Sequence, residues 1–224
     1  MLFDELTRMD AGPTNPAGPM RNVWTELQNR PIEFGQAIQR SLSGGFGLCC
    51  MNVRSEGNIG MMIRNACLMG ADEVIVCGRK KYDARFTVGA DHYIPVNFWP
   101  APLRVSIDHK ADATCTYDPT AFLECCAMGN WTPVFVEQGG IDIRTVAWTS
   151  IASPARPLLV MGNESSGIPR DFMDTVMCEN KDAIKVSIPQ WSVLRSMNVA
   201  MAAGIAMWEV RKSREKHSAI SDVA

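Results

Sequence analysis

The sequence predicts an α/β protein with a mostly parallel sheet that is covered by helices on both faces. Two observations lead to this fold class. Compact apolar runs of strand length alternate along residues 46–212 with segments of helical character, which is the pattern of successive βα units. The composition, 46% hydrophobic and 21% charged over 224 residues, is that of an ordinary globular domain, alone or with a small extension.

Strands are predicted where a compact apolar run is followed by a loop. These strands span residues 46–53, 72–78, 132–138, 157–162 and 184–189. The helices that alternate with them span residues 55–70, 121–129, 168–177 and 198–212. In the first helix Ile59, Met62, Ile63 and Ala66 recur at helical spacing, and Gly70 is a stop signal. A basic loop and the apolar stretch 92–96 follow the second strand.

The chain divides into three parts. Residues 1–45 are an N-terminal extension, residues 46–212 form the α/β domain, and residues 213–224 are a polar tail. Within the extension we expect a short helix at residues 2–9 and a linker or extended arm in the Pro- and Gly-rich residues 11–20. Residues 23–42 are expected to be helical, with an interruption at Pro31.

Composition argues against several classes of protein. No apolar run approaches the roughly 18 residues that cross a bilayer, and the first ten residues carry three acids and lack the apolar segment of a signal peptide. The eight cysteines and three histidines form no C-x-x-C or similar zinc spacing, so we expect free thiols and no metal. These features predict an intracellular protein, without distinguishing the cytoplasm from the mitochondrion.

The net charge of −2 is not that of a strong non-specific nucleic-acid binder, which would usually be basic. A role in nucleic-acid binding therefore needs local patches of positive charge. The sequence offers two such patches, one made of Arg79, Lys80, Lys81 and Arg85 and one made of Arg211, Lys212, Arg214 and Lys216. Charge runs of this kind are also typical of an ordinary solvated face.

Loops at the predicted carboxyl edge of the sheet carry the candidate functional residues, since ligands of parallel sheets bind beyond that edge. In the first loop, Asn58, Gly60 and Arg64 lie between the end of a strand and the next helix. Gly57 and Gly60 permit a close approach of backbone, and the Arg64 guanidinium can bind a phosphate through paired hydrogen bonds. Taken alone, Arg64 is more typical of a surface arginine on an amphipathic helix.

The second loop is bracketed by Gly162 and Gly167. Its backbone groups can cradle a small polar ligand, or it can be an ordinary turn that caps a helix. In the third loop, Ser196 and Asn198 flank Met197 at the start of the last helix. One of the two polar residues can cap that helix, which leaves the other free to bind something else.

The three loops together resemble the motifs of the SpoU/TrmH branch of the SPOUT methyltransferases. The motifs are Asn-x-Gly-x-x-x-Arg at a helix start, a strand followed by Gly-x-Glu-x-x-Gly, and Ile-Pro followed by Ser-Met-Asn before a helix of small residues. The resemblance covers about residues 46–212 and implies a parallel α/β domain with a C-terminal deep trefoil knot. It also implies S-adenosylmethionine as the cofactor, a homodimer, and methylation of the ribose 2′-hydroxyl of tRNA or rRNA, with no metal and no membrane.

The resemblance also implies a role for individual positions. The positions that match the family's catalytic and RNA-positioning polar residues are Asn58, Arg64, Glu164, Ser196 and Asn198. The positions that match its cofactor site are Val136, Glu137, Met161, Gly162, Asn163, Ile188, Gln190 and Met197. Binding of RNA is assigned to Arg54, Arg64, Arg79, Lys80, Lys81 and Arg85. Arg64 would activate the 2′-hydroxyl with help from an RNA phosphate.

The third motif departs from the family's pattern. Gln190 stands where the family usually has methionine, and Ser192 stands where it usually has glycine. A serine at a position that requires positive φ would strain the loop by about 1 kcal/mol or more. Trp191 between them would narrow the cofactor pocket or stack on a base. Met197 in place of the common leucine is a mild change.

Two other interpretations stay open. A non-catalytic member of the family could use the dimer as an RNA-binding or ribosome-assembly factor; the low net positive charge and the altered loop 190–192 favour it, and the retained polar residues argue against it. A nucleotide-binding doubly wound enzyme is disfavoured because the chain lacks G-x-G-x-x-G. Residues 1–45 are too few for a separate RNA-binding domain, so the sequence does not identify the RNA.

Overall fold

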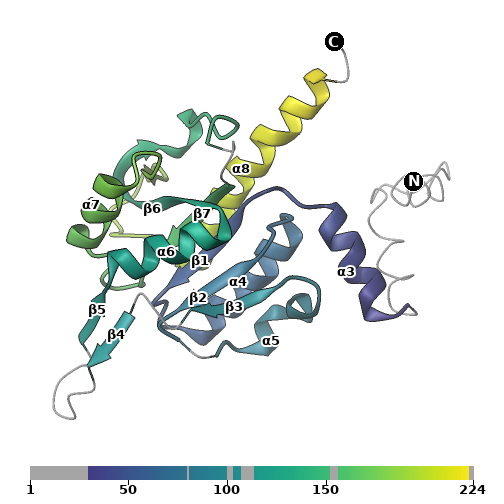
Figure 1. Ribbon diagram of the computed structural model, residues 1–224, viewed down its shortest axis with the longest axis horizontal. Helices are drawn as coiled ribbons and strands as arrows, with labels where there is room; N and C mark the ends of the chain where they lie inside the picture. The colour runs from purple at the N-terminus through teal and green to yellow at the C-terminus, as the bar shows by residue number, and fades with distance from the viewer. Residues whose placement is uncertain (1–29, 80, 100–102, 107–113, 152–155, 222–224) are drawn as a thin grey trace.

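The computed structural model describes residues 30–79, 81–99, 103–106, 114–151 and 156–221. Its centre is a six-stranded sheet in the order β3-β2-β1-β7-β6-β8, in which all neighbouring strands are parallel (Figure 1). The strands are β1 (Gly47–Met51), β2 (Val74–Cys77), β3 (Val96–Trp99), β6 (Trp131–Asp142), β7 (Arg156–Met161) and β8 (Ile184–Ser187). The predicted α/β class with a mostly parallel sheet is confirmed.

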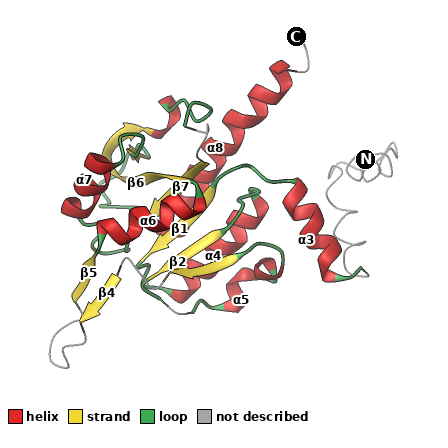
Figure 2. Cartoon of the chain, in the orientation of Figure 1, coloured by secondary structure: helices red, strands yellow, loops and turns green. Residues whose placement is uncertain are grey.

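Helices cover both faces of this sheet (Figure 2). The helices are α3 (Ile32–Ser41), α4 (Glu56–Leu68), α5 (Ala84–Thr87), α6 (Pro119–Gly129), α7 (Arg170–Glu179) and α8 (Val199–Ser221), with short 3-10 helices η1 (Ala90–His92) and η2 (Ile143–Thr145). Successive side chains of a strand point to opposite faces. Leu48 and Cys50 of β1 therefore join the core with α4 and α8, while Cys49 and Met51 join the core with α6 and α7.

The N-terminal extension is described only in part. Helix α3 begins directly after Pro31, which occupies its N-cap position. A proline is tolerated there because the first N–H groups of a helix have no partner within the helix. The predicted helix at residues 2–9, the linker at 11–20 and the first part of the predicted helix 23–42 lie outside the described residues.

Several boundaries differ from the prediction. The apolar stretch 92–96 lies mostly ahead of the third strand of the sheet, which is β3 at Val96–Trp99, paired with β2 from Val74 onward. Strands β4 (Leu103–Ser106) and β5 (Thr114–Tyr117) were not predicted; they form an antiparallel pair that projects from the body. Both alternate apolar and polar residues, as a strand does, but each is only four residues long, the lower limit at which this alternation predicts a strand.

Helix α8 is longer than the predicted helix 198–212 and extends away from the body (Figure 1). Its first half packs Ala203, Ala206, Met207 and Val210 into the core. Within the described residues, no helix combines the length and the apolar character that a membrane crossing needs.

Two glycines of α4 determine how closely α5 packs against it. A Cβ on Gly60 would lie 2.5 Å from the backbone oxygen of Asp83 and 2.9 Å from the Cβ of Phe86. A Cβ on Gly57 would lie 3.1 Å from the Phe86 ring. The close approach expected at Gly57 and Gly60 is therefore made by the segment 83–86 of the same chain.

We predict that Gly60→Ala lowers the free energy of unfolding by about 1–3 kcal/mol, because the added methyl group would push α5 away from α4. Gly204→Ala in α8 is the matched control. Its methyl group would meet only the Asn65 side chain, at 3.6 Å, so the better helix propensity of alanine should leave this variant at least as stable as the wild type. Chemical denaturation of both variants tests the prediction, and a Gly60→Ala protein of wild-type stability would contradict it.

Candidate active site

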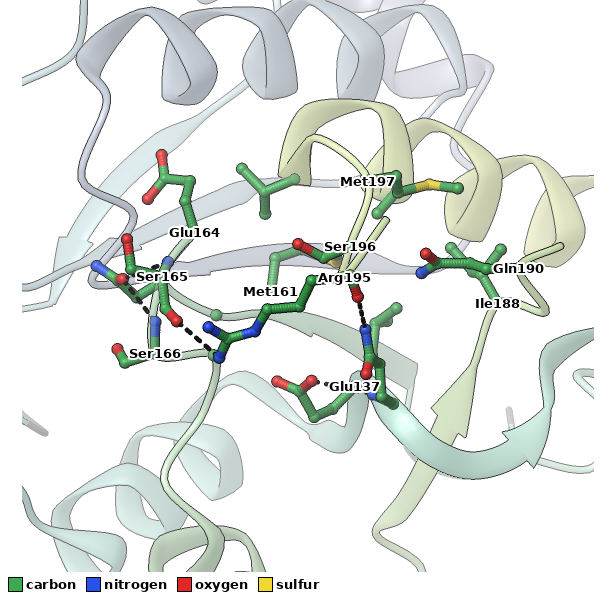
Figure 3. Close-up of a pocket in the computed structure, with 17 residues that line it drawn as sticks. Glu137, Met161, Glu164, Ser165, Ser166, Ile188, Gln190, Arg195, Ser196 and Met197 are labelled. Atoms are coloured by element: carbon green, nitrogen blue, oxygen red, sulfur yellow. Dashed lines mark hydrogen bonds between the residues drawn. The ribbon is translucent and has the colours of Figure 1, made fainter. Parts of the chain in front are cut away.

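A pocket opens at the carboxyl edge of the sheet, between the middle of β6 and the loops that follow β7 and β8 (Figure 3). Its space amounts to about 820 Å³ when the open mouth is included. The pocket is lined by all eight residues that the resemblance implies for the cofactor, namely Val136, Glu137, Met161, Gly162, Asn163, Ile188, Gln190 and Met197. The fold thus brings three separate segments to one cavity.

A shift in the register of β6 creates one wall of the pocket. Val136 pairs with Val186 of β8, and Ile141 pairs with the same Val186, so residues 137–140 leave the ladder. A Cβ on Gly140 would lie 2.7 Å from the backbone of Lys185, so glycine lets this bulge lie against β8. The bulge turns Glu137 toward the cavity instead of leaving it in a regular strand.

The loop after β7 is closed by its own hydrogen bonds. Asn163 and Gly167 exchange two backbone hydrogen bonds, of 3.2 and 2.9 Å, and the Asn163 Oδ1 accepts from the backbone N–H groups of Ser165 and Ser166 at 2.9 and 3.1 Å. Gly167 has a φ of 65°, a conformation that favours glycine. The Glu137 carboxylate accepts from the backbone N–H of Ile168 at 3.1 Å and ties the loop to β6.

Glu164 connects this loop to the start of α4. Its carboxylate accepts hydrogen bonds from the backbone N–H groups of Arg54 and Ser55, at 2.7 and 3.0 Å, and from the Asn58 side-chain amide at 2.8 Å. The Asn58 Oδ1 in turn accepts from the Asn198 side-chain amide at 3.1 Å. Glu164, Asn58 and Asn198 therefore form one hydrogen-bonded chain between three segments that are distant in sequence.

The ionised form of Glu164 is stabilised by these donors. Partial burial alone would raise the pKa of the carboxyl group, but the hydrogen bonds from Arg54, Asn58 and Ser55 outweigh it and hold the pKa below its ordinary value of 4.5. Glu164 is thus an anion at neutral pH whose oxygens are occupied by protein donors. It is suited to holding loops in place and poorly suited to removing a proton from a substrate.

Asn198 is the residue that caps α8. Its Oδ1 accepts from the backbone N–H groups of Ala200 and Met201, at 2.9 and 3.3 Å, which satisfies donors that the first turn of a helix leaves free. The other polar residue of the motif, Ser196, lines the pocket. The division expected from the sequence, with one residue as cap and one free, corresponds to Asn198 and Ser196.

Arg64 is not brought into this group. It lies well inside α4, is exposed to solvent and does not line the pocket. Its guanidinium makes no hydrogen bond or ion pair with the residues that the structure describes. Of the five predicted catalytic residues, Glu164, Asn58 and Asn198 are therefore joined by hydrogen bonds, and Glu164 and Ser196 line the pocket. Arg64 stands apart on the surface.

Two of the predicted RNA-binding cations, Lys81 and Arg85, are paired with carboxylates. Arg85 forms an ion pair with Asp83 at 2.7 Å, and Lys81 forms one with Glu56 at 3.3 Å. Arg54 is exposed, the Nε of Arg79 is buried without a partner among the described residues, and Lys80 lies outside them.

The C-terminal basic patch is also engaged where the structure describes it. Arg211 donates to the Leu42 backbone oxygen at 2.9 Å, and Lys212 pairs with Glu209 at 2.6 Å. The side chains of Arg214 and Lys216 are not among those described. The Arg211 contact ties α8 to the end of α3, while the Lys212 pair lies within α8.

The altered loop 190–192 shows no strain. Ser192 is not among the non-glycine residues with positive φ, which in the described part of the chain are Asn52, Val88 and Asn130. Trp191 is 84% exposed and does not line the pocket. It contributes instead to a neighbouring groove and lies 5.7 Å from the Arg144 guanidinium. The expected strain at Ser192 is therefore absent, and Trp191 does not narrow the pocket.

Sequence reasoning missed Arg195, which lies across the pocket in Figure 3. Its Nη2 donates to the Ser165 backbone oxygen at 3.2 Å, and its backbone oxygen accepts from the Gln138 side chain at 2.5 Å. The available signal was its place directly before Ser196 in the third motif. Gln138, Ser165 and Ser166 also line the pocket and were not singled out.

The seven cysteines whose side chains the structure describes are free. Burial raises the pKa of the Cys50 and Cys126 thiols well above its ordinary value, so both stay protonated. Among the described residues, no group of three or more His, Cys, Asp and Glu residues is placed to hold a metal ion.

Solved structures share the fold of this chain. The structure resembles the A. aeolicus TrmH/SpoU tRNA modifying enzyme, with a TM-score of 0.61, 18% identity, and coverage of 84% of this chain and 86% of that one. It resembles the SpoU methyltransferase AviRb from Streptomyces viridochromogenes in complex with AdoMet, with a TM-score of 0.57, 23% identity, and coverage of 75% and 57%. It also resembles an AdoMet-bound rRNA methyltransferase from Sinorhizobium meliloti, with a TM-score of 0.55, 25% identity, and coverage of 75% of this chain and 56% of that one.

The family follows from the sequence itself. The model of the SpoU rRNA methylase family matches residues 45–208, and the chain belongs to this family. The tRNA (guanosine(18)-2′-O)-methyltransferase TARBP1 of Mus musculus is 24% identical over 197 residues, which are 84% of this chain. The chain spans about a tenth of the length of that relative. The resemblance found in the sequence is thereby confirmed, and the expected deep trefoil knot fits this family.

We predict that Glu164→Gln lowers the free energy of unfolding at pH 7 by about 1–3 kcal/mol, because a neutral amide cannot satisfy three donors. In the wild type the pKa of Glu164 is lower in the folded than in the unfolded state. Its stabilising effect is therefore complete above the ordinary carboxyl pKa and is lost as the pH falls through the lowered pKa.

The difference in stability between the wild type and Glu164→Gln should therefore be largest near neutral pH and should shrink on acidification below the ordinary pKa of 4.5. Denaturation at a series of pH values measures this difference. Glu179→Gln, at an exposed position at the end of α7, is the control and should show no such change. A Glu164→Gln deficit that stays constant across the acidic range would contradict the prediction.

Proposed function

We propose that this protein is an S-adenosylmethionine-dependent RNA 2′-O-ribose methyltransferase that acts on tRNA or rRNA inside the cell, in the cytoplasm or in a mitochondrion. Residues 46–212 would be its methyltransferase domain. The observation that carries the proposal is the convergence of the three motif loops: eight family cofactor positions line one pocket, and the hydrogen-bonded chain of Glu164, Asn58 and Asn198 adjoins it. Membership of the SpoU family and the named activity of the mouse relative support it.

The pocket suits the chemical parts of the cofactor. Val136, Ile188 and Met197 supply apolar surface for the adenosyl part, and the carboxylates of Glu137 and Glu164 favour a positively charged sulfonium nearby. S-adenosylmethionine supplies a methyl group bound to a sulfonium sulfur. The thioether that this sulfur becomes is already a good leaving group. Transfer of this kind does not call for a metal.

The chain's own residues then have two tasks, which are to align the ribose hydroxyl and to help remove its proton. Ser196 lines the pocket and is placed to bond the ribose, while Asn198 is committed to its helix cap. Arg64 is exposed outside the pocket, where it can bind a phosphate of the RNA. An arginine is a poor base because its pKa exceeds about 12, so the proton would leave with help from that phosphate.

Titration calorimetry with S-adenosylmethionine and S-adenosylhomocysteine tests the proposal directly. We expect both to bind the purified protein in the micromolar range. Mapping of 2′-O-methyl sites in RNA from cells that lack the protein would then identify the substrate. A folded protein that binds neither compound would favour the alternative of an RNA-binding or ribosome-assembly factor. The changes at Gln190 and Ser192 would then explain why the cofactor does not bind.

We predict that Arg64→Ala reduces methyl transfer by about a hundredfold or more, the scale of a lost acid–base contribution. Its affinity for S-adenosylmethionine should stay within a few-fold, because Arg64 does not line the pocket. Transfer of a labelled methyl group to RNA from cells that lack the protein, together with calorimetry, separates the two effects. Arg170→Ala, an exposed arginine of α7, is the control, and undiminished transfer by Arg64→Ala would refute the role.

We also propose that the protein is a homodimer, with α8 in its interface. Met201, Ile205 and Trp208 are exposed by 63%, 36% and 50% and are spaced to lie along one face of α8. Beside them, Trp191 and Leu194 are exposed and line the neighbouring groove together with Ile205. A continuous apolar surface of this kind is typical of a protein interface.

We predict that Ile205→Glu makes the protein monomeric, because the interface would have to bury an unpaired charge. Light scattering at micromolar concentration measures the mass. Met128→Glu on α6, where methionine is 82% exposed, is the matched control and should leave the mass of a dimer unchanged. A wild type with the mass of a monomer would refute the proposal.

A further inference from the structure

Arg195 is the only cationic residue among the described residues that line the pocket. The other two charged lining residues are the carboxylates of Glu137 and Glu164. In Figure 3 the Arg195 side chain extends across the cavity, between the loop that carries Ser165 and the segment that carries Glu137. An arginine in this position either neutralises a protein carboxylate or meets a ligand.

The first possibility does not account for Arg195. Within the described part of the chain it forms no ion pair, and its guanidinium makes a single hydrogen bond, of 3.2 Å, to the backbone oxygen of Ser165. A guanidinium has five N–H donors, so most of its capacity is unused. Its backbone, by contrast, is held by the Gln138 side chain at 2.5 Å.

The two pocket carboxylates do not need Arg195 either. Glu164 accepts from Arg54, Ser55 and Asn58. Glu137 accepts from the backbone N–H groups of Gln138 and Ile168, at 3.0 and 3.1 Å. Arg195 is thus fixed at its backbone, while its guanidinium is loosely held and pairs with no carboxylate among the described residues.

The cofactor of the proposed function carries a carboxylate only at its amino-acid end, while its adenosyl part has none. A guanidinium matches a carboxylate with two parallel hydrogen bonds and is stronger in that pairing than on a neutral carbonyl. We propose that Arg195 recognises the carboxylate of the amino-acid end of S-adenosylmethionine and gives up its hydrogen bond to Ser165 when it does so. This inference rests on the proposed function and makes Arg195 a specificity residue for ligands with that end.

Two ligands separate this role from general effects on the pocket. S-adenosylhomocysteine contains the amino-acid carboxylate, and 5′-methylthioadenosine has the same adenosyl and thioether groups without it. Calorimetry should show that Arg195→Gln lowers the affinity for S-adenosylhomocysteine by about tenfold or more, which is the scale of a hydrogen bond to a charged group. The same substitution should leave the affinity for 5′-methylthioadenosine unchanged.

Two further variants sharpen the test. Arg195→Lys keeps the charge but lacks the paired donors, so it should lose less affinity for S-adenosylhomocysteine than Arg195→Gln does. Arg170→Gln, at an exposed position of α7 outside the pocket lining, should bind both ligands as the wild type does. Arg195 is exposed, so thermal unfolding of its variants should match the wild type.

The remaining outcomes would overturn the inference. If Arg195→Gln loses the same affinity for both ligands, Arg195 only shapes the pocket. If it loses affinity for neither ligand, Arg195 faces another partner, such as an RNA phosphate. In both cases the proposed function would stand, because the wild type would still bind the ligands. A folded wild type that binds neither ligand would overturn the proposed function and this inference together.

Discussion

The carboxylate of Glu164 is the group on which the arrangement of the site depends. Its three hydrogen bonds join the loop after β7 to the loop before α4, and Asn58 extends the connection to the cap of α8. A carboxylate can do this because it accepts several donors at once. Loss of its charge would weaken the bonds to Arg54, Ser55 and Asn58, so the geometry of the site and the stability of the fold respond to the same titration.

The pocket itself is a product of backbone irregularity. A regular β6 would have kept residues 137–140 in the ladder with β8, and the register shift lifts them out toward the loop after β7. Glu137 then closes the space between these two walls through its bond to Ile168. The central strands β1, β2 and β7 are regular and buried on both faces, which gives the irregular edge a rigid support.

The charged residues near the pocket divide into those that hold the protein together and those that are left for ligands. Glu137 and Glu164 are occupied by protein donors. Arg195 and Arg64 are not matched in this way, and they lie in different places, one across the pocket and one on the outer surface of α4. This separation supports distinct roles for them, toward the cofactor and toward RNA.

The sequence by itself determined the alternation of strands and helices, the parallel sheet and the three motif loops, because buried periodicity and short motifs are local in the chain. It also identified the eight positions that line the pocket, through resemblance to a family. It did not reveal the short strands β4 and β5, the partners of Gly57 and Gly60, the unstrained loop at Ser192 or the position of Arg195 across the cavity. Only the tertiary structure decided these features, because each depends on contacts between segments whose relative placement is set by packing and not by neighbouring residues.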